Sequence, residues 1–183
     1  MFEKPSPYSS PLEGEVGRGG NGYYERKIMS AKTIYLIFDG YWPEHESGKI
    51  PTTSGIYVVY EGAHDPAVGG VAPLRVLYIG SAENVQARIT GHEKWSEWRR
   101  QCQLGSLVYF SFAPIIGADL ERAEAALIYK HKPPVNEKYT KEFPFCETTI
   151  NLEGQCISAV PEHLQRRGKT VCLEKEFTVF QTD

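Results

Sequence analysis

Two tyrosines, an arginine and a glutamate lie at positions from which they can act on an anionic group. Tyr57 and Tyr78 belong to two consecutive apolar stretches, and Arg88 follows the second of them. An arginine guanidinium is a planar fork that matches the oxygens of a phosphate. Glu124 lies among apolar residues, where an unpaired charge is costly, so its carboxylate needs a cation. These side-chain types suit the handling of a phosphate beside a metal ion.

Each of these side chains also has an ordinary structural interpretation. Strands are rich in tyrosine, so Tyr57 and Tyr78 can pack on one face of a sheet. Arg88 can form a surface salt bridge with a distant carboxylate, because no acidic residue lies three or four positions away from it. Glu124 can be neutralised by Arg88, by a lysine or by Mg²⁺, an ion often held by one or two carboxylates. The residues alone leave these alternatives open.

The strands that must position the tyrosines follow from runs of β-branched and aromatic residues. These runs predict strands over residues 33–38, 55–60, 74–80 and 107–112. The second and third strands are antiparallel if they form a hairpin. The polar stretch 41–54 and the Gly/Ala/Pro stretch 61–73 are predicted loops.

Two helices are predicted to carry the arginine and the glutamate. The first covers residues 81–102, with Ser81 as its cap and a break at Gly91. The second is capped by Asp119 and has apolar residues at intervals of three or four, which is the spacing of a buried helix face. It ends at Pro133, because the residue before a proline avoids the helical conformation.

The order of the elements predicts an α+β fold with a small antiparallel β-sheet flanked by helices. Residues 1–28 are polar and rich in proline and glycine, so we expect a disordered extension. A domain is expected over residues 29–145. Residues 146–183 form a C-terminal extension, with short strands at 148–152 and 170–180 that pack on the core.

The composition is that of an ordinary globular chain. Of the 183 residues, 41% are hydrophobic and 23% are charged, and the formal net charge is -3. No apolar run approaches the length of a bilayer span, and the first residues lack the apolar core of a secretion signal. Four cysteines without metal-binding spacing are expected to be reduced, buried thiols. We therefore expect a cytoplasmic protein with no membrane association.

The positive charge is concentrated in the middle of the chain. Residues 88–141 hold nine Lys and Arg against six Asp and Glu. Aromatic residues such as Trp95 and Trp98 interleave with these cations, and such a mixture can follow a nucleic-acid backbone and stack bases. The alternative is that the tryptophans belong to the core and the lysines form a solvated face. The acidic total excludes binding by bulk charge.

An ordered set of short motifs carries a family resemblance. The set consists of Gly55-Ile56-Tyr57, Tyr78-Ile79-Gly80, Arg88, Glu124 and Asn136. In this order it resembles the GIY-YIG nuclease family over residues 52–140. The resemblance implies a core with the element order β-β-α-α-β-α. The triplets are separated by 20 residues here, which is longer than is usual in the family, and Ser81 stands where some members have a lysine.

The resemblance implies a metal-dependent endonuclease that hydrolyses phosphodiester bonds in nucleic acid, with DNA as the expected substrate. Glu124 would hold the Mg²⁺ or Mn²⁺ cofactor. Tyr57 would be the general base and Tyr78 would orient the water or the phosphate. Arg88 would stabilise the negative charge of the transition state.

The resemblance also implies supporting roles around these four residues. Asn136 would fix the geometry of the site, and His92 would assist proton transfer or pack. The expected substrate contacts are Gly80, Ser81, Lys94 and Lys132.

Two other classes of protein are compatible with the sequence. One is a module that grips nucleic acid without cutting it. The completeness of the motif set argues against this class, because a decayed site should have lost a member. The other is a protein-interaction domain, which the acidic net charge favours.

Overall fold

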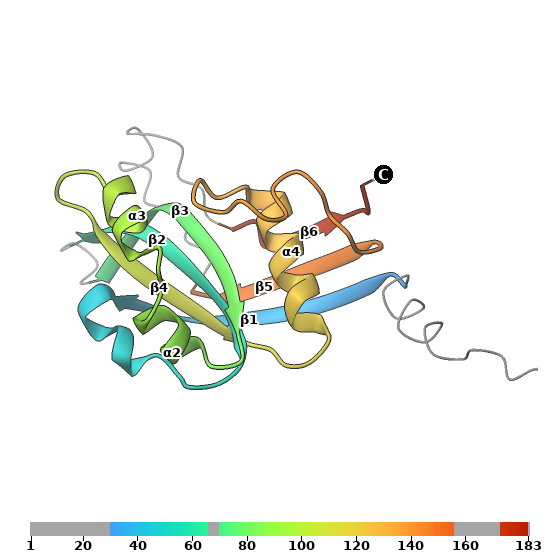
Figure 1. Cartoon of the computed structure of the whole chain (residues 1–183), viewed down its shortest axis with the longest axis horizontal. Coiled ribbons are helices and arrows are strands. Elements are labelled where there is room, and N and C mark those ends of the chain that lie inside the picture. Colours follow the sequence, from blue (N-terminus) through green and yellow to red (C-terminus); the bar gives the residue numbers. More distant parts are fainter. Residues whose placement is uncertain (1–29, 66–69, 156–172, 183) are drawn as a thin grey trace, which may run out of the picture.

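A computed structural model describes residues 30–65, 70–155 and 173–182 of the chain. Six strands form one curled sheet, and the helices lie against it (Figure 1). The elements are β1 (Lys32–Pro43), η1 (Glu44–Lys49), β2 (Gly55–Asp65), β3 (Gly70–Ala82), α2 (Val85–Thr90), α3 (Trp95–Gln101), β4 (Leu107–Pro114), α4 (Asp119–His131), β5 (Thr148–Gly154) and β6 (Glu176–Val179). The predicted α+β class is confirmed.

The strands follow the order β3-β2-β4-β1-β5-β6 across the sheet. Strands β2 and β3 form the predicted antiparallel hairpin, and β4 pairs with β2 on its other side. The expectation of a purely antiparallel sheet is wrong, because β1 and β5 run parallel. Helix α4 carries the chain from β4 past the neighbouring strand β1 to β5. Strand β5 runs opposite to β4, and because β1 is also antiparallel to β4, β5 is parallel to β1. The sheet is therefore mixed.

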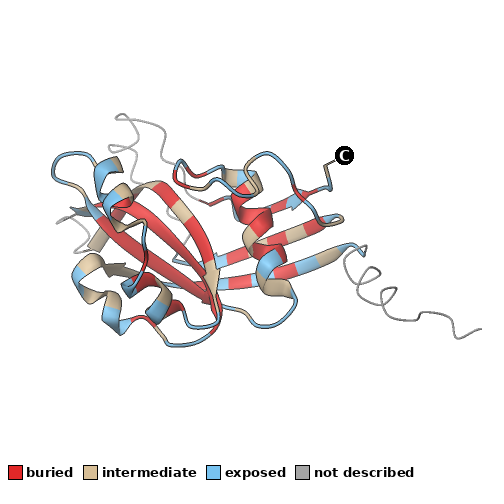
Figure 2. Ribbon diagram, viewed as in Figure 1, coloured by how far each residue is buried: buried red, intermediate tan, exposed pale blue. Residues whose placement is uncertain are grey.

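Successive residues of a strand point to opposite faces, so β2 contributes to two cores. Ile56 and Val58 pack on one face together with Leu127 of α4. Tyr57 and Val59 pack on the other face together with Trp98 of α3. Figure 2 shows buried residues along the central strands and on the inner side of α4. The tyrosine of the first motif thus lies on the face that α2 and α3 cover.

The predicted helix over residues 81–102 is broken at Gly91, as expected, but it begins later. Helix α2 starts at Val85, and the Asn84 side chain caps it by accepting the Ala87 N–H at 3.0 Å. Ser81 is not the cap, because the β2–β3 ladder continues past it to the end of β3. The serine hydroxyl is therefore available to the site.

Helix α4 has the predicted extent but not the predicted cap. Asp119 is its first residue and forms an ion pair with Lys32 of β1, so its carboxylate ties the helix to the sheet. The helix ends at His131. Lys132 follows in the left-handed conformation, with φ of 46°, and Pro133 prevents continuation.

The loops predicted over 41–54 and 61–73 are shorter than expected. Strand β1 continues to Pro43, and η1 fills part of the first stretch. Strands β2 and β3 extend into the second stretch from both sides, because β4 supplies partners for β2 as far as Gly62. A neighbouring strand here overrides the low strand propensity of glycine and proline.

Several expectations concern segments outside the described residues. The extension over residues 1–28 is among them, and so are residues 170–172 of the last predicted strand.

Cys102 and Cys146 are free thiols and are half-buried rather than buried, whereas Cys156 and Cys172 lie outside the described residues. In the part of the chain that the structure describes, no helix is long and apolar enough to cross a membrane.

Candidate functional site

The two motif tyrosines meet in a cluster of aromatic rings beside α3. The ring centroids of Tyr57 and Tyr78 are 6.1 Å apart. The ring centroid of His92 lies 5.3 Å from that of Tyr78 and 6.2 Å from that of Tyr57. The imidazole also packs on Trp98, with the ring centroids 4.5 Å apart. Trp98 is fully buried, so the core interpretation holds for this tryptophan. Three of the predicted site residues are therefore in mutual contact.

Gly80 makes room for this arrangement. It lies opposite Tyr57 in the β2–β3 ladder. A Cβ atom added at Gly80 would stand 2.4 Å from the Tyr57 hydroxyl oxygen. The expected substrate contact at Gly80 is thus a buried packing position, and its lack of a side chain lets the phenol cross the neighbouring strand.

Arg88 reaches the cluster from α2, where its side chain is 38% exposed. Both outer nitrogens of its guanidinium bond to the carboxylate of Glu93, at 2.8 and 3.0 Å. The guanidinium also stabilises a negative charge on Tyr57, by hydrogen bonding and by its own charge. The salt-bridge interpretation therefore holds, and the partner lies five residues along the chain. The regular helix spacings of three and four do not reveal such a pair.

Burial raises the pKa of both phenols above the ordinary value for tyrosine. The charge on Glu124 raises the pKa of Tyr57 and Tyr78 further, while the Arg88 guanidinium lowers both. The two phenols are therefore neutral near pH 7 in this arrangement. Tyr57 is fully buried, whereas Tyr78 is half-buried and lines a cavity. Of the two hydroxyls, that of Tyr78 is the better placed to meet a substrate.

His92 is buried and neutral. Its Nδ1 atom accepts a hydrogen bond from the backbone N–H of Lys94 at 3.0 Å, which assigns the proton to Nε2. Burial and the positive charge of Arg88 lower the pKa of His92 to about 4. Among the described residues, the buried Nε2 atom has no hydrogen-bond partner. This orphaned donor lies within the cluster that holds both phenols.

A cavity of about 240 Å³ adjoins Tyr78, between β3, α4 and the segment after α4. It is lined by Tyr78, Lys94, Glu124, Ile128, Asn136, Glu137, Lys138 and Tyr139. Four of these residues were predicted for the site, namely Tyr78, Lys94, Glu124 and Asn136. Glu137 was not predicted for the site, whereas Lys138 and Tyr139 belong to the basic and aromatic residues of the central stretch but were not among the expected substrate contacts. Their position directly after a motif residue was the available signal.

Glu124 is half-buried at the wall of this cavity. The Ser81 hydroxyl donates a hydrogen bond to its carboxylate at 2.8 Å. Burial raises the pKa of Glu124, and the hydrogen bond from Ser81 opposes that rise. A carboxylate at the wall of a cavity suits Mg²⁺, because this ion keeps several waters and takes further oxygens from a substrate phosphate. No cluster of three or more His, Cys, Asp or Glu side chains suited to a metal occurs in the described part of the chain.

Asn136 holds the outer edge of β3. Its side-chain amide donates to the carbonyl oxygen of Ile79 at 2.8 Å and accepts the Ile79 N–H at 2.9 Å. The N–H of Val135 bonds to the carbonyl of Leu77 at 3.1 Å. Because Tyr78 lies between these two attachment points, Asn136 fixes the strand that carries the phenol. Its amide acts on the backbone rather than on a substrate.

The basic side chains at the site differ in where they lie. The Lys94 ammonium group lines the cavity and bonds to the carbonyl of Val135 at 3.2 Å and to Glu137 at 3.1 Å. Lys132 is not brought to the cavity. Its ammonium group lies over the ring of Tyr129 and lines a separate cavity of about 440 Å³ beside β6.

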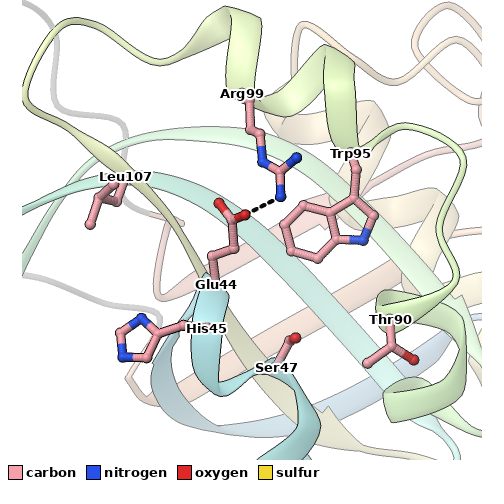
Figure 3. A pocket seen from close by; sticks show the side chains of 7 residues that line it. All are labelled: Glu44, His45, Ser47, Thr90, Trp95, Arg99 and Leu107. Atoms are coloured by element: carbon pink, nitrogen blue, oxygen red, sulfur yellow. Dashed lines mark hydrogen bonds and ion pairs between the residues drawn. The ribbon is translucent and has the colours of Figure 1, made fainter.

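A larger cavity of about 700 Å³ opens between η1 and α3 (Figure 3). Its walls are formed by Glu44, His45, Ser47, Thr90, Trp95, Arg99 and Leu107. Arg99 lies 5.1 Å from the centre of the Trp95 ring and forms an ion pair with Glu44. None of the predicted site residues lines this cavity, and its arginine is already neutralised. The smaller cavity therefore remains the candidate site.

The fold and the site together describe an α+β protein in which Arg88 interacts with Tyr57, while Tyr78 and Glu124 line one cavity at the edge of a curled mixed sheet. Searches against protein-family models, curated proteins and solved structures find no match.

Proposed function

We propose that this chain is a metal-dependent endonuclease of the GIY-YIG type that hydrolyses phosphodiester bonds in nucleic acid, with DNA as its substrate. The observation that carries the proposal is the meeting of Tyr57, Tyr78 and Arg88 beside the cavity that holds Glu124. These residues are far apart in sequence, and ordinary packing does not require a carboxylate and a guanidinium at one aromatic cluster.

The order of elements along the chain also supports the proposal. Strands β2 and β3, helices α2 and α3, strand β4 and helix α4 follow one another in the order that the resemblance implies. Both triplets lie on the β2–β3 hairpin, and Glu124 lies on α4.

In the proposed reaction, a water molecule attacks the phosphorus atom and the P–O bond to the leaving strand breaks. Arg88 binds a non-bridging phosphate oxygen and stabilises the charge that develops there. Tyr78, as the phenolate, would orient the water and take its proton as the O–P bond forms, and the leaving oxygen would take a proton from solvent. Tyr57, which was expected to be the base, is fully buried and would support Tyr78 from the inner side. Asn136 keeps the strand that carries Tyr78 in place.

Glu124 would hold a divalent cation with the help of the Ser81 hydroxyl. When bound, the cation would polarise the phosphate and neutralise the carboxylate that raises the pKa of both tyrosines. Deprotonation of Tyr78 would then become easier, with Arg88 and Lys94 already acting in the same direction. This accounts for how phenols with raised pKa values can serve as catalytic groups.

The surface charges favour modest, salt-sensitive binding of nucleic acid. Many cations of the central basic stretch are paired with carboxylates; examples are Lys130 with Glu174, Lys138 with Glu121, and Arg99 with Glu44. Paired cations contribute less to binding than free ones, so we expect a modest affinity that still falls as the salt concentration rises.

A cleavage assay tests the proposal directly. Labelled single strands, duplexes, flaps and junctions of DNA and RNA are incubated with the full chain in Mg²⁺, Mn²⁺ or EDTA. We expect metal-dependent cutting that falls about 10²- to 10³-fold in Glu124→Gln and in Tyr78→Phe. Glu142→Gln, which removes an exposed carboxylate from the segment after α4, is the matched control and should cut like the wild type.

The other two classes of function are outcomes of the same experiment. If no substrate is cut but an electrophoretic shift shows salt-dependent binding, the chain is a gripping module. If it neither cuts nor binds, the endonuclease proposal is wrong and a protein-interaction domain remains.

A further inference from the structure

We propose that Glu93 occupies the position of a substrate phosphate on Arg88 and thereby limits how tightly the site binds nucleic acid. The inference rests on the proposed function and deepens it, because it identifies a residue that controls substrate affinity at the same site. Neither the motif set nor the resemblance assigns a role to this residue.

The geometry of the pair carries the inference. The two carboxylate oxygens of Glu93 accept from the two outer nitrogens of Arg88, at 2.8 and 3.0 Å. Two non-bridging oxygens of a phosphodiester bind a guanidinium fork in the same two-point manner. The carboxylate therefore takes the donors that a substrate phosphate would use.

The surroundings of Glu93 allow it to be displaced. It lies in the short connection between α2 and α3, and its side chain is 62% exposed. Its neighbour His92 is buried among aromatic rings, which anchors the backbone while the Glu93 side chain projects outward. A change of side-chain rotamer is therefore enough to release Arg88 without movement of the fold.

The charge of Glu93 adds to the competition. The hydrogen bonds from Arg88 lower the pKa of Glu93 to about 2, so the carboxylate is ionised throughout the physiological range. A phosphate that approaches Arg88 meets this negative charge and must replace it. Loss of the charge should favour the substrate.

A positioning role for Glu93 would predict the opposite change in affinity. If Glu93 served to hold Arg88 in its active orientation, its removal would weaken binding and lower the rate. The sign of the effect of one substitution therefore separates competition from positioning.

Fluorescence anisotropy with a labelled DNA oligonucleotide measures the effect in EDTA, where no cleavage interferes. The full chain is compared with Glu93→Gln, Arg88→Ala and the double variant. Glu83→Gln removes a negative charge from the segment just before α2 and serves as the control. We expect Glu93→Gln to bind about two- to tenfold more tightly, Glu83→Gln to change affinity much less, and the gain to vanish in the Arg88→Ala background.

The outcomes separate this inference from the proposed function. Unchanged or weaker binding by Glu93→Gln, while the wild type binds, overturns the role of Glu93 and leaves the nuclease proposal standing. A gain that persists without Arg88 also overturns it, because the effect is then general charge repulsion. Absence of binding by every variant overturns the proposed function and the inference together.

Discussion

The phenol of Tyr57 crosses the backbone of Gly80 on the neighbouring strand, with its hydroxyl oxygen 2.4 Å from the point where a Cβ atom would stand. The last residue of the second motif thus determines where the last residue of the first can lie. Two triplets that look independent in the sequence form one packing unit in the hairpin.

Gly80→Ala should disturb this unit. The added methyl group must displace a buried ring, so we expect the free energy of unfolding to fall by about 1–3 kcal/mol. Urea denaturation followed by fluorescence measures the change. Gly48→Ala is the control, because an added Cβ there has no heavy atom within 4 Å. Equal stability of the two variants would show that Tyr57 does not need the space.

Asn136→Ala should free the outer edge of β3. Because both hydrogen bonds of the amide go to Ile79, we expect exchange of the Ile79 N–H to accelerate by about tenfold or more. Hydrogen exchange observed by NMR resolves this amide. The Leu152 amide of β5, which bonds to the carbonyl of Lys175 at 2.7 Å, should keep its protection. Unaltered protection of Ile79 would remove the positioning role of Asn136.

Ser81→Ala should raise the pKa of Glu124. Burial already raises that pKa, and the hydrogen bond from Ser81 opposes the rise, so its loss leaves the burial effect unopposed. NMR titration of the glutamate side-chain carboxyl carbons follows the shift. Glu121, whose pKa is lowered by Tyr139 and Lys138, should titrate as before. A Glu124 pKa that stays the same or falls would contradict the assigned bond.

Acid should destabilise the fold through its buried histidines. The pKa of His92 is lowered from 6.5 to about 4 in the folded chain, so the unfolded chain binds more protons in this interval. The contribution of neutral His92 to the free energy of unfolding is therefore fully present above pH 6.5 and is lost as the pH falls towards 4. Urea denaturation at a series of pH values should show this decline.

His92→Phe isolates the contribution of that histidine. The phenyl ring keeps the packing on Trp98 but cannot take up a proton, so the decline between pH 6.5 and 4 should become shallower. A decline remains, because burial also lowers the pKa of His131 to about 4. An identical pH profile in the variant would assign the effect elsewhere.

Local pattern was enough to predict the central strands and α4, because their residues alternate or recur at helical spacing. It could not predict that β5 joins β1 in parallel, since that pairing depends on where the chain goes after α4. The cap of α2 was assigned to Ser81 rather than Asn84 for a related reason. Both residue types cap helices, and only the length of the hairpin decides between them.

The candidate site, too, could be predicted from the sequence only in part. Glu124 was identified because a carboxylate on an apolar helix face needs a partner. The two-point contact of Asn136 with Ile79 could not be predicted, because it joins a loop to a strand edge far away in the sequence. The raised pKa of Tyr57 could not be predicted from the sequence either, because it is caused by burial, which exists only after folding.

The pairing of β1 with both β4 and β5 has a practical consequence for trimming the chain. A fragment limited to residues 52–140 would contain every motif residue but would lack β1 and β5. The edge of β4 that now bonds to β1 would be bare, and the inner face of α4 would lose the apolar contacts from Leu36 and Ile150. Exposed strand edges recruit other chains, so such a minimal fragment should aggregate on expression. The shortest soluble form should begin before Lys32 and include β5.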